Sequence, residues 1–116
     1  MATPRIEDYG FGHIVVDGQT YDKDLIILPD RIISGWWREK GHRLKAADLD
    51  AILEAKPEVL VVGRGAYGRM SVSNKARRAL EQAGIELIAR PTGEAVKTYN
   101  HLRRERRAAA ALHLTC

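Results

Sequence analysis

The stretch PEVLVVGRGAYGRMSVSNKARRALEQAGIELIA, residues 57–89, decides the fold class of this chain. Its segment Val59–Val62 is apolar throughout, which is typical of a strand that packs on both faces. After a glycine-rich loop, apolar residues recur every three or four positions over 72–83, as on one face of a helix. A second strand, Ile85–Ala89, follows this helix. The order of strand, helix and strand predicts an α/β domain.

The flanking sequence predicts further elements on both sides of this stretch. Asp17-Gly18 favours a tight hairpin turn, because glycine adopts positive φ without a Cβ clash. The chain end is ambiguous, because the alanines at 108–111 favour a helix by propensity, whereas the sequence Ala-Leu-His-Leu suits a strand. No element is predicted for residues 1–8, which we expect to be poorly ordered. The other predicted elements are strands at 13–16, 19–21, 25–28 and 31–37 and helices at 46–55 and 93–106.

Length and composition limit the classes of protein to which the chain can belong. Its 116 residues suffice for one domain, residues 1–116, with a core that needs no metal or disulfide. Aromatic residues make up only 6%, which does not favour nucleic-acid binding, and the longest apolar run, Ala108–Leu112, is far too short for a membrane span. The single cysteine and the N-terminus without an apolar leader indicate a reducing compartment. We therefore expect a soluble cytoplasmic domain.

Positive charge gathers in the second half of the chain. Residues 1–58 carry a net charge of −3, with 8 Lys/Arg against 11 Asp/Glu, whereas residues 59–116 carry +7, with 11 against 4. Such a surface attracts anionic partners, although a short charge run is also typical of a solvated helix face. The densest basic run contributes four candidate partner-binding residues: Arg103, Arg104, Arg106 and Arg107.

The other half of the predicted partner surface is the unusual run Trp36-Trp37-Arg38 with the nearby His42. Successive side chains of a strand face opposite sides, so one tryptophan is expected in the core and the other on the surface as an anchor for a partner. The alternative is that both tryptophans pack beneath the helices.

The loop after Val59–Val62 has the spacing G-x-G-x-x-G of dinucleotide-binding turns. In such turns, glycines let the phosphates approach the amides of a helix N-terminus. Here residues 69–72 separate the third glycine from the predicted helix, and only one β-α-β unit fits the chain, so a structural turn is favoured. Binding of a small anion or nucleotide, with Glu86 near the position of a ribose ligand, is the alternative. The candidate ligand residues are Gly63, Arg64, Gly65, Gly68 and Arg69.

The sequence contains no recognisable pattern for catalysis or metal binding. His113-x-x-Cys116 has a ligand-like spacing, but no second ligand pair accompanies it, and a nucleophile at Cys116 would need a base and an orienting group. The patterns G-x-S-x-G and H-E-x-x-H do not occur in the sequence, and its carboxylates are scattered. We therefore predict no metal, no cofactor and no catalytic residue, which favours a non-enzymatic role.

A set of short motifs follows in order along nearly the whole chain. They are Tyr9-Gly10-Phe11-Gly12, Leu28-Pro29-Asp30, Trp36-Trp37-Arg38, Gly41-His42, Val62-Gly63-Arg64-Gly65, Glu94-Ala95-Val96-Lys97-Thr98-Tyr99-Asn100 and His113-Leu114-Thr115-Cys116. In this order they resemble the Mth-domain family of unknown function.

This resemblance implies a single three-layer α/β domain, in which a central mixed β-sheet is flanked by helices and a β-hairpin forms an additional layer. It also implies a strand for residues 108–114. Members of the family have no established catalytic activity or cofactor, and its mitochondrial relatives are assembly factors for respiratory complex I. Arg64 departs from the small polar residue usual in the family, and no mitochondrial presequence is evident, so the role in respiratory complex I is not carried over.

Two functions are therefore predicted. The favoured one is a non-catalytic protein-binding or assembly-factor-like module, which holds an unidentified protein through the tryptophan segment and the basic run. The alternative is a small-molecule binder or enzyme that uses the loop 63–68 to hold an anion or nucleotide. A homodimer is also compatible with the sequence, because an exposed edge strand and an apolar tryptophan suit self-association.

Overall fold

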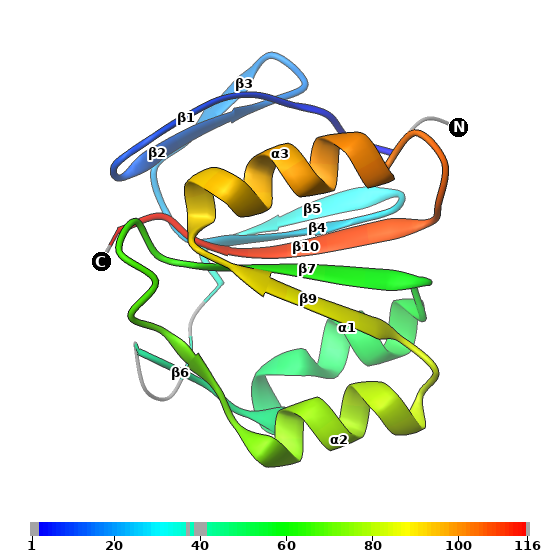
Figure 1. Cartoon of the computed structure of the whole chain (residues 1–116). Helices are drawn as coiled ribbons and strands as arrows, with labels where there is room; N and C mark the ends of the chain where they lie inside the picture. Colours follow the sequence, from blue (N-terminus) through cyan, green and yellow to red (C-terminus); the bar gives the residue numbers. More distant parts are fainter. Residues whose placement is uncertain (1–2, 37, 39–41, 116) are drawn as a thin grey trace.

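Five strands form the centre of the molecule in the computed structural model, which describes residues 3–36, 38 and 42–115 (Figure 1). Their order is β5-β4-β10-β7-β9, and the sheet is mixed because β10 runs parallel to β7 and antiparallel to β4. A layer of β1, β2 and β3 packs together with α3 on one face, while α1 and α2 cover the other. The predicted α/β fold with its extra hairpin layer is confirmed. The elements are β1 Ile6–Gly10, β2 His13–Val16, β3 Gln19–Tyr21, β4 Leu25–Leu28, β5 Arg31–Ser34, β6 Arg43–Leu44, a 3-10 helix Ala46–Leu49, α1 Asp50–Ala55, β7 Val59–Arg64, β8 Ser71–Val72, α2 Asn74–Gln82, β9 Glu86–Arg90, α3 Thr92–Leu102 and β10 Ala108–His113.

The hairpin layer confirms one prediction and corrects another. Strands β2 and β3 have the predicted bounds, and Asp17-Gly18 between them adopts positive φ at both residues. Strand β1, however, begins at Ile6, whose backbone N–H donates to Asn100 Oδ1 at 3.0 Å and whose carbonyl accepts from Asn100 Nδ2 at 2.6 Å. Residues 6–8, for which no element was predicted, therefore belong to a strand, because a side chain of the distant α3 holds this segment.

Strand β10 lies between β4 and β7 and is buried along its whole length. Ala109 and Ala111 belong to the core on the α1–α2 face, whereas Ala108 and Ala110 belong to the core on the α3 face. Alanine suits this position because small side chains let both outer layers pack closely on the sheet. Burial between two strands thus overrides the helix propensity of alanine, and the prediction of a strand is confirmed.

Three other predicted elements differ from the structure in type or in length. The predicted helix 46–55 is a 3-10 turn followed by α1, and the strand predicted for 31–37 ends at Ser34, because Gly35 leaves the extended region with a φ of +72°. Helix α3 ends at Leu102, whose carbonyl accepts the N–H groups of Glu105 and Arg106 in a turn that leads back into β10. Within the described ranges, no helix is long and apolar enough to cross a membrane.

Candidate functional site

The carboxyl ends of the parallel strands β7, β9 and β10 meet at one edge of the central sheet, on the left in Figure 1. Strand β10 ends at His113, which lies opposite Arg64 at the end of β7. The loop 65–70 and the β1–β2 turn lie at the same edge, because both hydrogen-bond to the segment after β10. We call this region the carboxyl edge. In open α/β sheets, ligand sites commonly form at such an edge.

The backbone of the candidate ligand loop is bonded within the protein. The Gly65 N–H donates to Thr92 Oγ1 at 2.8 Å, and this hydroxyl in turn donates to the carbonyl of His113 at 2.7 Å. The Ala66 N–H donates to the carbonyl of Thr115, and the Gly68 N–H donates to that of Gly65. A dinucleotide turn would instead present such amides to phosphate.

The glycines of this loop have packing reasons of their own. A Cβ on Gly63 would lie 2.9 Å from both Leu112 Cδ2 and Thr92 Oγ1, so only glycine allows β7, β10 and α3 to pack this closely. Gly68 adopts a φ of +67°, and the Arg64 Nε donates to the carbonyl of Met70 at 2.7 Å, which closes the loop. The chain then enters the short strand β8 before α2. This arrangement favours the structural interpretation of the glycine fingerprint.

The tryptophan segment does not form the predicted surface anchor where it is described. Trp36 is 8% exposed and lies after β5 rather than within it, and its Nε1 donates to the carbonyl of Asp48 at 3.3 Å. The Arg38 guanidinium covers this indole at 4.7 Å and is 6% exposed. Trp36 and Arg38 are therefore buried rather than exposed to a partner, because the Trp36 indole packs in the core on the α1–α2 face and Asp24 pairs with Arg38. Trp37 lies outside the described residues.

A cluster of charged side chains that sequence reasoning missed lies at the carboxyl edge. Asp24 Oδ2 accepts from Arg38 NH2 at 2.8 Å and lies 2.7 Å from His113 Nδ1, while its Oδ1 accepts the Leu114 N–H at 2.8 Å. The exposed His42 places its ring edge-on to His113, with centroids 5.9 Å apart. These groups come from three separate segments, so spacing along the sequence gives no signal for them.

The partners of Asp24 determine its titration. Burial alone would raise the pKa of this carboxyl, but the hydrogen bonds from His113, Leu114 and Arg38 outweigh it and hold the pKa below its usual value. His113 places its Nδ1 3.1 Å from Arg38 NH2 as well as beside the Asp24 carboxylate. Its Nε2 is buried and has no hydrogen-bond partner among the described residues. The cluster therefore ties β10 to the segment before β4 and to Arg38.

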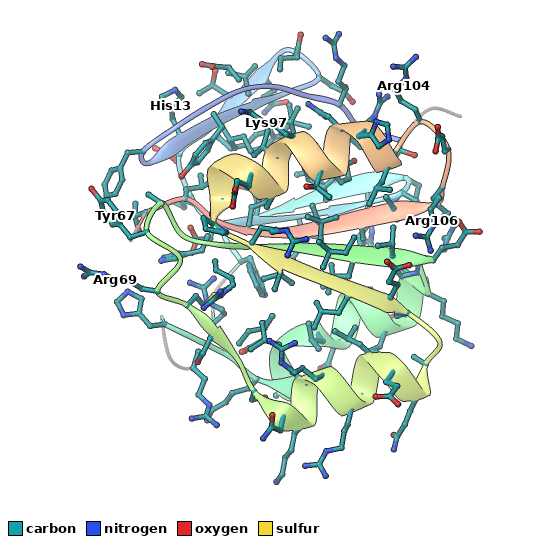
Figure 2. All side chains as sticks on the ribbon, in the orientation of Figure 1. His13, Tyr67, Arg69, Lys97, Arg104 and Arg106 are labelled. Atoms are coloured by element: carbon teal, nitrogen blue, oxygen red, sulfur yellow. The ribbon has the colours of Figure 1, made fainter. Side chains whose placement is uncertain are left out.

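The predicted basic run is mostly engaged in structural contacts at the opposite end of the sheet. The Arg103 guanidinium donates to the carbonyl of Thr3 at 3.0 and 2.7 Å, and Arg106 pairs with Glu86 at 2.8 Å. Arg107 NH1 donates to two carbonyls near the end of α1. Arg104 and Arg107 are exposed, and of the four only Arg104 makes none of these contacts. Figure 2 shows Arg104 and Arg106 far from the carboxyl edge. The basic run and the tryptophan segment therefore do not form one surface.

Two aromatic side chains stand out at the carboxyl edge instead. Phe11 is 60% exposed and Tyr67 is 70% exposed, and they are the large hydrophobic residues that the described part of the chain exposes. The Arg69 guanidinium lies 5.6 Å from the Tyr67 ring, and both project from the loop in Figure 2. Both aromatic residues lie in glycine-containing turns. An aromatic residue in a glycine-rich turn cannot easily reach the core, so this sequence pattern could have indicated that Phe11 and Tyr67 are exposed.

Comparison with solved structures places the chain in one fold. It matches the conserved hypothetical protein PH1505 from Pyrococcus horikoshii with a TM-score of 0.83 and 32% identity, over 97% of this chain and 99% of that one. A Bordetella parapertussis protein matches with a TM-score of 0.80 and 28% identity, over 97% and 96%. A Bordetella pertussis protein described as a Mth938-like domain matches with a TM-score of 0.65 and 22% identity, over 96% and 85%. The fold is therefore that of the Mth938-like α/β domains.

The sequence comparison identifies the family as well. Residues 6–113 match the family described as "Protein of unknown function (DUF498/DUF598)". The chain belongs to this family, which confirms the resemblance drawn from its motifs and leaves its function open.

Proposed function

We propose that this domain is a non-catalytic protein-binding module with an assembly-factor-like role. Its docking surface is the aromatic patch, which we define as Phe11, Tyr67 and Arg69. The observation that carries the proposal is the joint exposure of the two aromatic rings on turns that the fold holds side by side.

The two turns of the aromatic patch are fixed to the same short segment. The Gly12 N–H donates to the carbonyl of Leu114 at 2.9 Å, and the Ala66 N–H donates to the carbonyl of Thr115 at 2.8 Å. Phe11 and Tyr67 each neighbour one of these bonded residues. Because their backbones are already held, a partner would not have to order the loops, which reduces the entropic cost of binding.

The residues of the patch have the chemistry of binding hot spots. Aromatic side chains bury about 150–250 Å² each, and tyrosine and arginine are enriched among residues that dominate binding energy. Contiguous apolar patches that are rimmed by polar residues mark protein-interaction sites.

Charge at the carboxyl edge indicates the kind of partner. Arg64, Arg69 and Arg90 lie at or just beyond the carboxyl ends of β7 and β9, and the Arg69 guanidinium lies 5.6 Å from the Tyr67 ring itself. The carboxylates nearby, Glu7, Asp8 and Glu94, line a separate hollow between β1 and α3. Interfaces form between surfaces of opposite electrostatic potential, so these arginines favour an acidic partner. The proposed occupant is a segment of another protein that carries acidic side chains around an apolar anchor.

The test is affinity capture with the full chain, followed by calorimetry with the captured protein after purification. We expect Tyr67→Ala to weaken binding by about 30-fold, equivalent to about 2 kcal/mol for a hot-spot tyrosine. Arg69→Glu should weaken binding as well, whereas Arg104→Glu, the same charge change on the far side, should leave affinity within about 3-fold.

Two results would overturn this proposal. One is equal binding by the wild-type chain and Tyr67→Ala. The other is self-association, measured by sedimentation, that Tyr67→Ala abolishes, because the occupant of the patch would then be a second copy of the chain.

A further inference from the structure

A surface cavity of about 620 Å³ lies between the 3-10 turn after β6 and the start of α2, on the opposite face of the sheet from α3. Four of its lining side chains are cationic: Arg43, Lys45, Lys75 and Arg78. Among the described residues that line it, none is acidic. We call this cavity the basic cleft; it shares no lining residue with the aromatic patch.

The cations of the basic cleft come from two segments that the fold joins. The short strands β6 and β8 pair in parallel, and the Ser73 N–H donates to the carbonyl of Leu44 at 2.9 Å. This pairing sets Arg43 and Lys45 across the cavity from Lys75. Bringing like charges together costs free energy, so an anion bound between them would be stabilised by all four.

The cationic side chains of the basic cleft differ from arginines elsewhere in the protein in their ion pairing. Arg38 and Arg106 are paired with carboxylates, whereas the side chains of Arg43, Lys75 and Arg78 form no ion pair within the part of the chain that the structure describes. The nearby Asp48 carboxylate accepts the backbone N–H of Lys45 at 2.9 Å and does not line the cavity.

The remaining lining groups suit a ligand with both a polar and an apolar part. Ser73 Oγ accepts the Ala76 N–H at 3.1 Å, and its own O–H donates to no described residue, so it can donate to an anion. Ala46 and Ala47 supply an apolar wall. The volume lies within the range of about 300–1,000 Å³ that is usual for small-molecule sites and exceeds what one phosphate ion fills.

We propose that the basic cleft binds a small molecule that carries at least two linked phosphate groups, such as a nucleoside diphosphate. Arginine matches phosphate oxygens with paired donors, and lysine adds compact positive charge. This site is independent of the proposed protein-binding function and of the loop 63–68.

The test is calorimetric titration of the full chain with ADP, pyrophosphate, orthophosphate and adenosine. We expect saturable binding of ADP and pyrophosphate that is weaker for orthophosphate and not detected for adenosine. Lys75→Glu and Arg78→Glu should each weaken ADP binding by about 10-fold or more, as expected for the loss of one charge-assisted contact. Because both side chains are exposed, the melting temperature should stay unchanged.

Arg77→Glu is the matched control, because Arg77 is the neighbouring exposed cation on α2 but does not line the cleft. Its affinity for ADP should stay within about 3-fold of wild type. Three results would each overturn the proposal. They are an equal loss of ADP affinity in Arg77→Glu and Arg78→Glu, the absence of saturable binding of ADP or pyrophosphate, and orthophosphate binding as tight as pyrophosphate binding. The proposal would also be overturned by an oligonucleotide that binds more tightly than ADP and depends on Lys75 and Arg78, because the cleft would then belong to a nucleic-acid surface.

Discussion

Replacing Asp24 by asparagine is expected to destabilise the domain by about 3–5 kcal/mol at neutral pH. Its carboxylate lies within 2.8 Å of Arg38 NH2, His113 Nδ1 and the Leu114 N–H. The substitution would leave the buried guanidinium of Arg38 without its anionic partner, and removal of one partner from a buried ion pair typically costs this amount. For a domain of 116 residues, the loss corresponds to a fall in melting temperature of about 12–20 °C.

The assay is urea denaturation of both chains at pH 7 and at pH 3. The folded-state pKa of Asp24 lies below its usual value, so its contribution to stability is complete above the unfolded pKa of about 3.9. That contribution is lost as the pH falls through the folded pKa. The difference in unfolding free energy between wild type and Asp24→Asn should therefore narrow below about pH 4. Asp22→Asn, at an exposed site nearby, should cost less than about 0.5 kcal/mol at either pH.

Either of two results would refute this reasoning about Asp24. The first is a loss below about 1 kcal/mol at pH 7, which would mean that the carboxylate does not hold a buried charge. The second is a difference between the two chains that stays the same at pH 3.

Three further substitutions, the first with a matched control, test how the fold is held together. Gly63→Ala should destabilise the domain by about 1–3 kcal/mol in urea titrations, because its Cβ would overlap two side chains. The control, Gly93→Ala in α3, adds a Cβ that meets nothing within 4 Å and should stabilise by about 0.5–1 kcal/mol. Equal effects of the two substitutions would contradict the close approach of Leu112 and Thr92 to Gly63. Asn100→Ala should lose both hydrogen bonds to Ile6 and cost about 2 kcal/mol, with faster amide exchange confined largely to β1, and unchanged exchange there would show that Asn100 does not hold this strand. Trp36→Ala should cost about 3–5 kcal/mol and leave the affinity of the folded chain for its protein partner unchanged, whereas a stable variant with weakened binding would restore Trp36 to the partner surface.

Local patterns predicted the elements whose formation depends on neighbours in sequence. The hairpin around Asp17-Gly18, the helix capped by Ser73 and the apolar strand β7 all lie where the sequence places them. For each of these, the turn residue, the cap or the apolar period is itself the physical cause of the structure.

The alanine strand β10 shows where local patterns fail. Intrinsic propensity favours a helix there. The segment forms a strand instead because it hydrogen-bonds to β4 and β7 on its two sides and packs into a core on each face of the sheet. The family resemblance supplied what propensity could not, because it carries information about the whole fold.

The functional residues were harder to predict than the fold. Trp36 and the basic run attracted attention by composition, yet long-range packing buries Trp36 and engages Arg103, Arg106 and Arg107 in structural contacts. The basic cleft arises from the pairing of two-residue strands, β6 and β8, which leave almost no periodic signal. Charge and aromatic content could be counted in the sequence, but exposure depends on the tertiary fold.

Site-specific crosslinking at the aromatic patch tests the protein-binding function most directly. A photoreactive phenylalanine analogue would replace Tyr67 in one variant and Arg104 in another, each expressed as the full chain in cells of the source organism. We predict that the Tyr67 position forms a discrete adduct with another protein, that Arg69→Glu in the same chain removes it, and that the Arg104 position does not form it. Identical adducts from both positions, or an adduct at Tyr67 that persists with Arg69→Glu, would contradict the assignment of the aromatic patch as the docking surface.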